Sequence, residues 1–200
     1  RRVLRKLGHL AFFTSCSAPS GVSARPGERC GRGYALAEAC VNAGARTTLI
    51  SGPVHCEAPP GVVLVPVETT QEMLDASMAA SDDADIFIGA AAVVDFRPES
   101  VATQKIKREG STTMDLKLVS NPDIIASIAA RQVRPSLVVG FAAETNDVTT
   151  YARNKLEKKR LDFIFANDVS DSAIGFNSDS NAGTLISADN DITMAVSSKR

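Results

Sequence analysis

Segments with the apolar pattern of helices alternate along this chain with short apolar runs typical of strands, and this alternation restricts the possible folds. Residues 33–43 are rich in alanine and leucine, and Gly44 follows them as a residue that often ends helices. Residues 47–50 then form a short β-branched run. Repeated helix-to-strand units of this kind predict a parallel sheet covered by helices.

Further units follow. Residues 62–67 predict a strand, and Thr69 with Glu72 three residues later forms a capping box that opens a helix to about residue 78. Residues 86–94 are almost continuously apolar, as in a strand buried in the middle of a parallel sheet. The remaining expected elements are an edge strand at 114–119, core strands at 137–143 and 163–166, a helix at 148–159 capped from 144–147, and a terminal hairpin at 184–186 and 192–196.

Asn121, Pro122 and Asp123 predict the start of another helix, which should continue to about residue 131. Asparagine can cap free amides, proline suits the first turn, and aspartate complements the helix dipole. Together these elements predict an α/β fold: a Rossmann-like three-layer sandwich with a mostly parallel central sheet and a C-terminal hairpin. Because the chain has no repeats or low-complexity linkers, residues 1–200 are expected to form a single domain.

Composition excludes some partners. A net charge of −1 favours neither nucleic acid nor an anionic membrane, and no run of 18 apolar residues suggests a membrane span, so we expect a cytoplasmic protein. The four cysteines (Cys16, Cys30, Cys40 and Cys56) form no Cys-x-x-Cys pair, so we expect reduced thiols and no zinc site.

Polar or small residues directly after apolar strands mark candidate binding positions, because ligands of open α/β sheets bind outside the carboxyl ends of the strands. Three strand ends fit this description, at residues 89–95, 140–145 and 166–168. Taken singly, an acidic residue there is more often a cap or turn residue than a ligand.

Two groups of basic residues have both an ordinary and a functional interpretation. Lys155 and Lys159 are four residues apart and share a helix face, which is usually a solvated face but can bind phosphates. Residues 105–108 (KIKR) belong to a loop that could close over an anionic ligand. Gly31 and Gly33 only partly match a dinucleotide-binding loop, since Leu36 stands where a third small residue is needed.

Seven stretches together resemble phosphopantothenate–cysteine ligase (phosphopantothenoylcysteine synthetase), the C-terminal half of a bacterial bifunctional coenzyme A biosynthesis protein. They occur in the order and spacing typical of that family. The matching stretches are residues 33–53, 87–99, 105–108, 121–126, 138–145, 151–159 and 166–181.

The resemblance implies a nucleotide site and assigns residues to it. Gly89, Ala90, Ala91 and Asp95 would lie at the nucleotide, and a helix start formed by Pro122, Asp123, Ile124 and Ile125 would present amides to it, which agrees with the preference of helix starts for anions. Phe141, Lys155 and Lys159 would complete the pocket, Lys105 would serve the second half-reaction as a catalytic residue, and Asp95 is the candidate metal ligand.

The resemblance also implies the reaction and its partners. The carboxylate of 4'-phosphopantothenate would attack the α-phosphate of CTP to give an acyl-cytidylate, and the amine of L-cysteine would then displace CMP. Magnesium would accompany CTP, the domain would form a homodimer, and FMN would belong only to a decarboxylase domain, absent here, that is covalently joined in the parent protein.

Residues 14–32 depart from the family pattern. The segment is several residues shorter than in the family, and Pro26 stands where the family has the asparagine that handles the phosphopantothenoyl intermediate. Residues 1–8 would be a linker from the decarboxylase domain, and the family's final helix would be missing. Two alternatives therefore stay open: a nucleotide-binding pseudoenzyme or regulatory module, and a nicotinamide-dependent oxidoreductase, although Leu36 breaks the glycine pattern that the latter needs.

Overall fold

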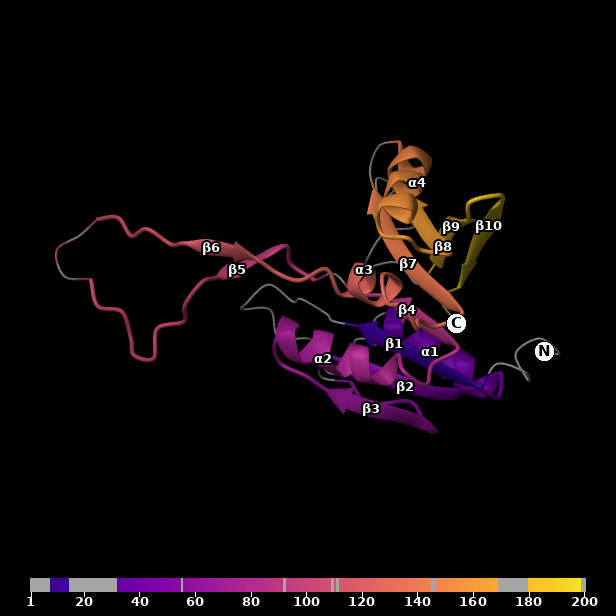
Figure 1. Cartoon of the computed structure of the whole chain (residues 1–200), viewed down its shortest axis with the longest axis horizontal. Coiled ribbons are helices and arrows are strands. Elements are labelled where there is room, and N and C mark those ends of the chain that lie inside the picture. The colour runs from indigo at the N-terminus through magenta and orange to yellow at the C-terminus, as the bar shows by residue number, and fades with distance from the viewer. Residues whose placement is uncertain are drawn as a thin grey trace.

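The computed structural model describes residues 8–14, 32–54, 56–91, 93–108, 110, 112–144, 147–168 and 180–198. An eight-stranded sheet forms its centre, with the strand order β10-β9-β8-β7-β4-β1-β2-β3 (Figure 1). The strands are β1 (His9–Thr14), β2 (Arg46–Ser51), β3 (Val62–Pro66), β4 (Ile86–Gly89), β7 (Leu137–Glu144), β8 (Phe163–Asp168), β9 (Ser180–Ile186) and β10 (Asp191–Ser198).

The first six of these strands in chain order are parallel, and the order β3-β2-β1-β4-β7-β8 is that of a Rossmann fold. The β9–β10 hairpin joins the sheet antiparallel to β8. The predicted α/β class, the mostly parallel sheet and the C-terminal hairpin are therefore confirmed. Strand β1 was not predicted, and it is the strand that pairs with both β2 and β4.

Helices cover both faces of the sheet, which confirms the predicted three layers. The helices are α1 (Arg32–Asn42), α2 (Thr70–Ala80), α3 (Ile124–Ala129) and α4 (Val148–Lys158). The larger core cluster joins α2, α3 and α4 to one face through Met73, Ile128 and Leu156. On the other face, α1 packs through Tyr34 and Ala37. No described helix has the length and apolar character needed to span a membrane.

An arm projects from the edge of this body between β4 and α3 (Figure 1). Its base is a two-stranded antiparallel ribbon of β5 (Phe96–Pro98) and β6 (Leu118–Ser120). The prediction of one strand over 86–94 was wrong, because β4 ends at Gly89 and the chain then turns toward the arm. The edge strand expected at 114–119 is also displaced, since only its last two residues belong to β6.

Helix starts follow the predicted chemistry in part. The capping box of α2 is confirmed: the Glu72 amide donates to Thr69 Oγ1 at 3.1 Å, and Glu72 Oε2 accepts from the Thr69 amide at 3.2 Å. The amides of Glu68 and Thr69 lower the pKa of the Glu72 carboxyl from its ordinary value of 4.5. In α3 the cap is Asp123 and not Asn121, so Pro122 precedes the helix. Asp147 takes the N-cap position of α4 but makes no side-chain cap bond.

The expectation that every cysteine is a reduced thiol was wrong for Cys56, which is disulfide-bonded. Cys40 is a free thiol on α1, and burial raises its pKa to about 11. Cys16 and Cys30 lie outside the described residues.

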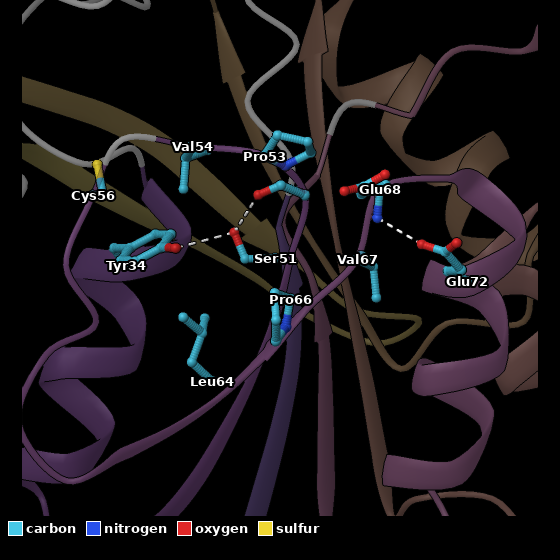
Figure 2. Close-up of a pocket in the computed structure, with 11 residues that line it drawn as sticks. Tyr34, Ser51, Pro53, Val54, Cys56, Leu64, Pro66, Val67, Glu68 and Glu72 are labelled. Carbon is cyan, nitrogen blue, oxygen red and sulfur yellow. Dashed lines mark hydrogen bonds between the residues drawn. The ribbon is translucent and has the colours of Figure 1, made fainter.

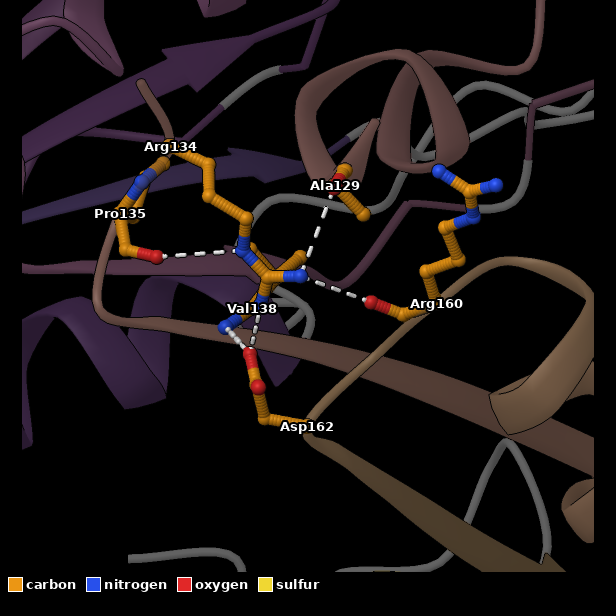
Figure 3. A network of polar contacts seen from close by, with 6 residues as sticks. All are labelled: Ala129, Arg134, Pro135, Val138, Arg160 and Asp162. Atoms are coloured by element: carbon orange, nitrogen blue, oxygen red, sulfur yellow. Dashed lines mark hydrogen bonds and ion pairs between the residues drawn. The ribbon is translucent and has the colours of Figure 1, made fainter. Parts of the chain in front are cut away.

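Arg134 and Asp162 tie three elements together at the amino end of β7 (Figure 3). The Arg134 guanidinium pairs with Asp162 and donates to the carbonyl oxygens of Ala129 at 3.4 Å and Arg160 at 3.0 Å. Asp162 Oδ2 also accepts from the Val138 amide at 2.7 Å. This network joins the end of α3 and the turn after α4 to β7, the strand between them.

Replacing Asp162 with alanine should lower the free energy of unfolding by about 2 kcal/mol, because the amide of the buried Val138 would lose its acceptor and the Arg134 guanidinium would lose its ionic partner. Urea unfolding of the two proteins measures the difference. Asp189→Ala is the control, since Asp189 is exposed in the β9–β10 turn. A loss no larger than that of the control would show that the network does not stabilise the fold.

Candidate functional site

The sheet reverses its strand order between β1 and β4, and this is the point where open α/β sheets bind ligands. From β1 the chain builds outward through β2 to β3, and from β4 it builds the other way through β7 to β8. Phe13 of β1 and Gly140 of β7 flank Gly89, the last residue of β4. The first of the predicted strand ends, residues 89–95, therefore starts at the reversal.

The chain after β4 is fixed against the segment before α3. The Asn121 side chain donates to the Val94 carbonyl oxygen at 2.8 Å, and its backbone amide donates to the Asp95 carbonyl oxygen at 2.8 Å. Ala90 and Ala91 are half-buried, whereas Asp95 is exposed. The structure thus brings the predicted group of Gly89, Ala90, Ala91 and Asp95 close to the predicted helix start. Asn121, which the sequence indicated only as a helix cap, links the two segments.

At that helix start, the side chains of Ile124 and Ile125 are buried in the core, with 2% and 8% of their surface exposed. Only their backbone amides are available to a ligand. The Asp123 carboxylate caps the helix, since its Oδ1 accepts from the Ala126 amide at 3.1 Å. The first two amides of a helix have no partner within the helix, so those of Ile124 and Ile125 are the ones that an anion could use.

The two predicted lysines lie at the carboxyl end of α4, the helix that packs between β7 and the β9–β10 hairpin. Lys155 and Lys159 are both half-buried. Lys159 Nζ lies 2.9 Å from Asp123 Oδ2, with 31% of the lysine side chain and 46% of the aspartate side chain exposed. Lys159 therefore meets the α3 start. Arg153 anchors the same helix to Asp191 of β10 through two contacts of 2.8 Å.

Phe141 does not join this group through its side chain. Gly140 and Ala142 face α3 and α4, as shown by the contacts that a Cβ at Gly140 would make with Ile125 and Leu161 and by the place of Ala142 in the larger cluster. Phe141 lies between them on the strand, so its side chain points to the opposite face of the sheet. There its ring meets that of Phe165 at 5.5 Å with an interplanar angle of 51°.

Asn167 is a candidate site residue whose burial the sequence did not reveal. It pairs with Ala143 at the carboxyl ends of β8 and β7, two residues beyond Phe165 and on the same face of the sheet. Asn167 is 1% exposed, and neither its Oδ1 nor its Nδ2 has a hydrogen-bond partner among the described residues. Because a buried amide without partners costs free energy, its presence at a strand end points to a functional use. The sequence marked 166–168 as a strand end, but only packing shows that this amide is enclosed and unpaired.

Lys105 lies apart from these residues. It belongs to the arm, is exposed, and is carried away from the sheet between β5 and β6 (Figure 1). Its neighbours on the arm include exposed apolar side chains, with 84% of Val101 and 61% of Ile106 accessible. Within one chain, the structure therefore does not bring Lys105 to the lysines of α4.

A hollow of about 460 Å³ lies elsewhere, at the carboxyl ends of β2 and β3 (Figure 2). In its wall the Tyr34 hydroxyl donates to Ser51 Oγ at 3.1 Å, and Ser51 Oγ donates to the Gly52 carbonyl oxygen at 3.0 Å. Glu72 lines the opposite side, where its carboxylate caps α2. The hollow is on the other side of the β1/β4 reversal from the predicted nucleotide residues, and the side chains of Tyr34, Ser51 and Glu72 in its wall already have hydrogen-bond partners.

Metal ligands are sparse in the part of the chain that the structure describes, which contains no group of three or more His, Cys, Asp or Glu side chains able to hold an ion. A magnesium ion does not need such a group, because it keeps several of its waters and can be held by one carboxylate together with the phosphates of a ligand. Asp95 is exposed and available for that role. Pro26 and the other residues of 15–31, which make up most of the segment 14–32 that departs from the family pattern, lie outside the described residues.

Comparison with known proteins identifies the family of this chain. Residues 29–200 match the model of the DNA/pantothenate metabolism flavoprotein C-terminal domain family. The coenzyme A biosynthesis bifunctional protein CoaBC of Vibrio parahaemolyticus is 51% identical over 168 residues, which is 84% of this chain and 42% of that protein. The CoaBC protein of Escherichia coli K12 is 47% identical over 169 residues, again 84% of this chain and 42% of the relative. The chain thus spans about two fifths of the length of these relatives.

Solved structures show the same fold. The crystal structure of the C-terminal domain of coenzyme A biosynthesis bifunctional protein CoaBC superimposes with a TM-score of 0.72 at 30% identity, covering 98% of this chain and 90% of that one. A Cab2 variant in complex with phosphopantothenate-cysteine has a TM-score of 0.65 at 13% identity, covering 97% of this chain and 82% of that one, and supports the fold alone. On the family match and these identities, the chain belongs to the DNA/pantothenate metabolism flavoprotein C-terminal domain family.

Proposed function

We propose that this chain is a phosphopantothenate–cysteine ligase that uses CTP to join L-cysteine to 4'-phosphopantothenate in coenzyme A biosynthesis. The observation that carries the proposal is the meeting of Lys159 with the α3 start, beside the small-residue end of β4 at the strand reversal. A cation, free helix amides and closely approachable backbone are what a nucleoside triphosphate needs. Membership of a family whose named relatives act in coenzyme A biosynthesis supports it.

The chemistry has two steps. A carboxylate oxygen of 4'-phosphopantothenate attacks the α-phosphorus of CTP, and pyrophosphate leaves. The amine of cysteine then attacks the acyl carbon, CMP leaves with the bonding electrons, and the amine proton passes to solvent. Since all the reactants carry phosphate or carboxylate groups, Lys155 and Lys159 would offset their repulsion and hold the phosphates, while the amides of Ile124 and Ile125 donate to phosphate oxygens. Magnesium, held by Asp95 and the phosphates, would supply further positive charge.

We assign the base of the nucleotide to the other side of the β7 and β8 ends. Phe141 and Phe165 offer aromatic surface there, and the unpaired amide of Asn167 has both a donor and an acceptor for the edge of a base. In this arrangement the nucleotide would cross the carboxyl ends of the strands, with its phosphates toward α4. That path explains why Phe141 and Lys159, on opposite faces of the sheet, could serve one ligand.

We further propose that the domain forms a homodimer through the arm. Large apolar side chains on the arm are exposed, including Val101, Ile106, Met114 and Leu116 at 84%, 61%, 62% and 56%. Apolar surface of this extent on a projecting element is typical of an interface. We also propose that an FMN-dependent decarboxylase domain is the covalent neighbour in the parent protein, and the bifunctional names of the relatives support this. We place the parent protein in the cytoplasm.

The direct test is calorimetry with CTP plus magnesium and, separately, with NAD. We expect CTP to bind and NAD to bind far more weakly, because the chain offers phosphate-binding groups at α3 and α4 but no complete dinucleotide loop. Binding of NAD without CTP would support an oxidoreductase instead. CTP binding without formation of phosphopantothenoylcysteine would support a nucleotide-binding module that is not a ligase.

Replacing Asn167 with leucine, which has the same branching, should raise the free energy of unfolding by about 1 kcal/mol, since it removes an unpaired buried amide. The same change should weaken CTP binding several-fold. Urea unfolding and calorimetry measure the two effects. A variant with reduced stability and unchanged CTP affinity would remove Asn167 from the proposed base site.

Lys105→Gln should separate the two half-reactions. If Lys105 serves the second step, pyrophosphate release from CTP and 4'-phosphopantothenate should continue while transfer to cysteine fails, so that acyl-cytidylate accumulates in quenched samples. A lysine on a projecting arm can close over the acyl group after the first step and stabilise charge in the second. Lys117→Gln, elsewhere on the arm, is the control for charge. Equal loss of both products would place Lys105 at the triphosphate, and no loss would make it a surface residue.

A further inference from the structure

The ion pair between Asp123 and Lys159 joins the two elements that we assign to the triphosphate. Lys159 is the C-cap residue of α4, and Asp123 is the N-cap residue of α3. Their charged groups approach to 2.9 Å although the residues are 36 positions apart in the chain (159 − 123). The positive group proposed to bind phosphate therefore already has an anionic partner within the protein.

Of the two side chains, the carboxylate is the more firmly fixed. Asp123 Oδ1 accepts from the Ala126 amide at 3.1 Å, so the helix cap holds the carboxylate independently of Lys159. The ammonium of Lys159 ends a flexible four-carbon stem, and 31% of the side chain is exposed. Movement of the pair would therefore be movement of the lysine.

We propose that Asp123 is an internal competitor for Lys159, so that the Asp123 carboxylate and a phosphate of the bound nucleotide are alternative partners of the same ammonium. The proposal rests on the function proposed above. Lys159 leaves Asp123 when the phosphate arrives, and returns when the product departs. The triphosphate thus binds less tightly than the lysines alone would allow, which favours release of pyrophosphate and CMP.

The opposite role, in which Asp123 merely holds Lys159 ready for the ligand, fits the charges less well. A phosphate that bound the Lys159 ammonium while the pair remained closed would also lie close to the Asp123 carboxylate. The two negative groups repel each other, and the attraction of the ammonium is already largely compensated by the carboxylate. Exchange of partners avoids this repulsion by separating the ammonium from the carboxylate.

The decisive variant is Asp123→Asn, which removes the charge but keeps an oxygen that can cap the Ala126 amide. Calorimetry with CTP plus magnesium, and with inorganic tripolyphosphate, should show about tenfold tighter binding than the wild type, equivalent to about 1.4 kcal/mol. In a Lys159→Gln background the same change should alter affinity less than about twofold, because the ammonium for which Asp123 and the phosphate compete is then absent. Asp189→Asn, at an exposed position, is the control for net charge.

Weaker binding by Asp123→Asn that disappears in the Lys159→Gln background would make Asp123 a positioning residue and overturn the proposal. An equal effect in both backgrounds would also overturn it, since the two side chains would then act independently. The proposed function can fail separately: tripolyphosphate binding that Asp123→Asn strengthens, without any binding of CTP, would support the competition and reject the CTP ligase.

Discussion

Parallel pairing of β4 with β1 on one side and with β7 on the other is the constraint on which the rest of the structure depends. This strand has only four residues, and Phe87 at its centre is fully buried. The chain builds outward in opposite directions from β1 and β4, and open α/β sheets bind ligands at the carboxyl ends of the strands where the order reverses in this way. The residues that follow β4 are therefore free to approach a ligand, and the helix start after the arm is brought back to them by Asn121.

Basic side chains of α4 and its C-cap are paired with acidic side chains of neighbouring elements. Lys159 and Asp123 form an ion pair, and Arg153 is used to anchor α4 to Asp191 instead of facing the site. A half-buried lysine without a nearby anion would cost free energy, because its ammonium would lose part of its hydration without compensation. A lysine that is already paired can exchange its carboxylate partner for a phosphate. One helix-cap residue, Asp123, thus offsets the charge of the lysine that we propose to bind phosphate.

The arm and Asn167 are two features of the candidate site that the strand ends in the sequence do not reveal. Lys105 is distant from the α4 lysines because the ribbon of β5 and β6 leads the chain away from the sheet. Exposed apolar residues on the arm, such as Val101, favour burial against another surface. Asn167, in contrast, is buried with an unpaired side-chain amide, which costs free energy. A ligand that forms hydrogen bonds with this amide would remove that cost.

The sequence by itself determined the class of fold, since helical and strand patterns alternate along the chain. Each pattern depends on which sides of the helix or strand are buried, and this can be read from neighbouring residues. It also determined the capping box of Thr69 and Glu72, which depends only on neighbouring residues. Tertiary structure alone decided where β4 ends and which face Phe141 occupies, because an apolar run does not specify its strand register. It alone decided that Asp123, the cap of α3, also pairs with Lys159, since the distance between groups far apart in the chain is set by how their helices pack on the sheet.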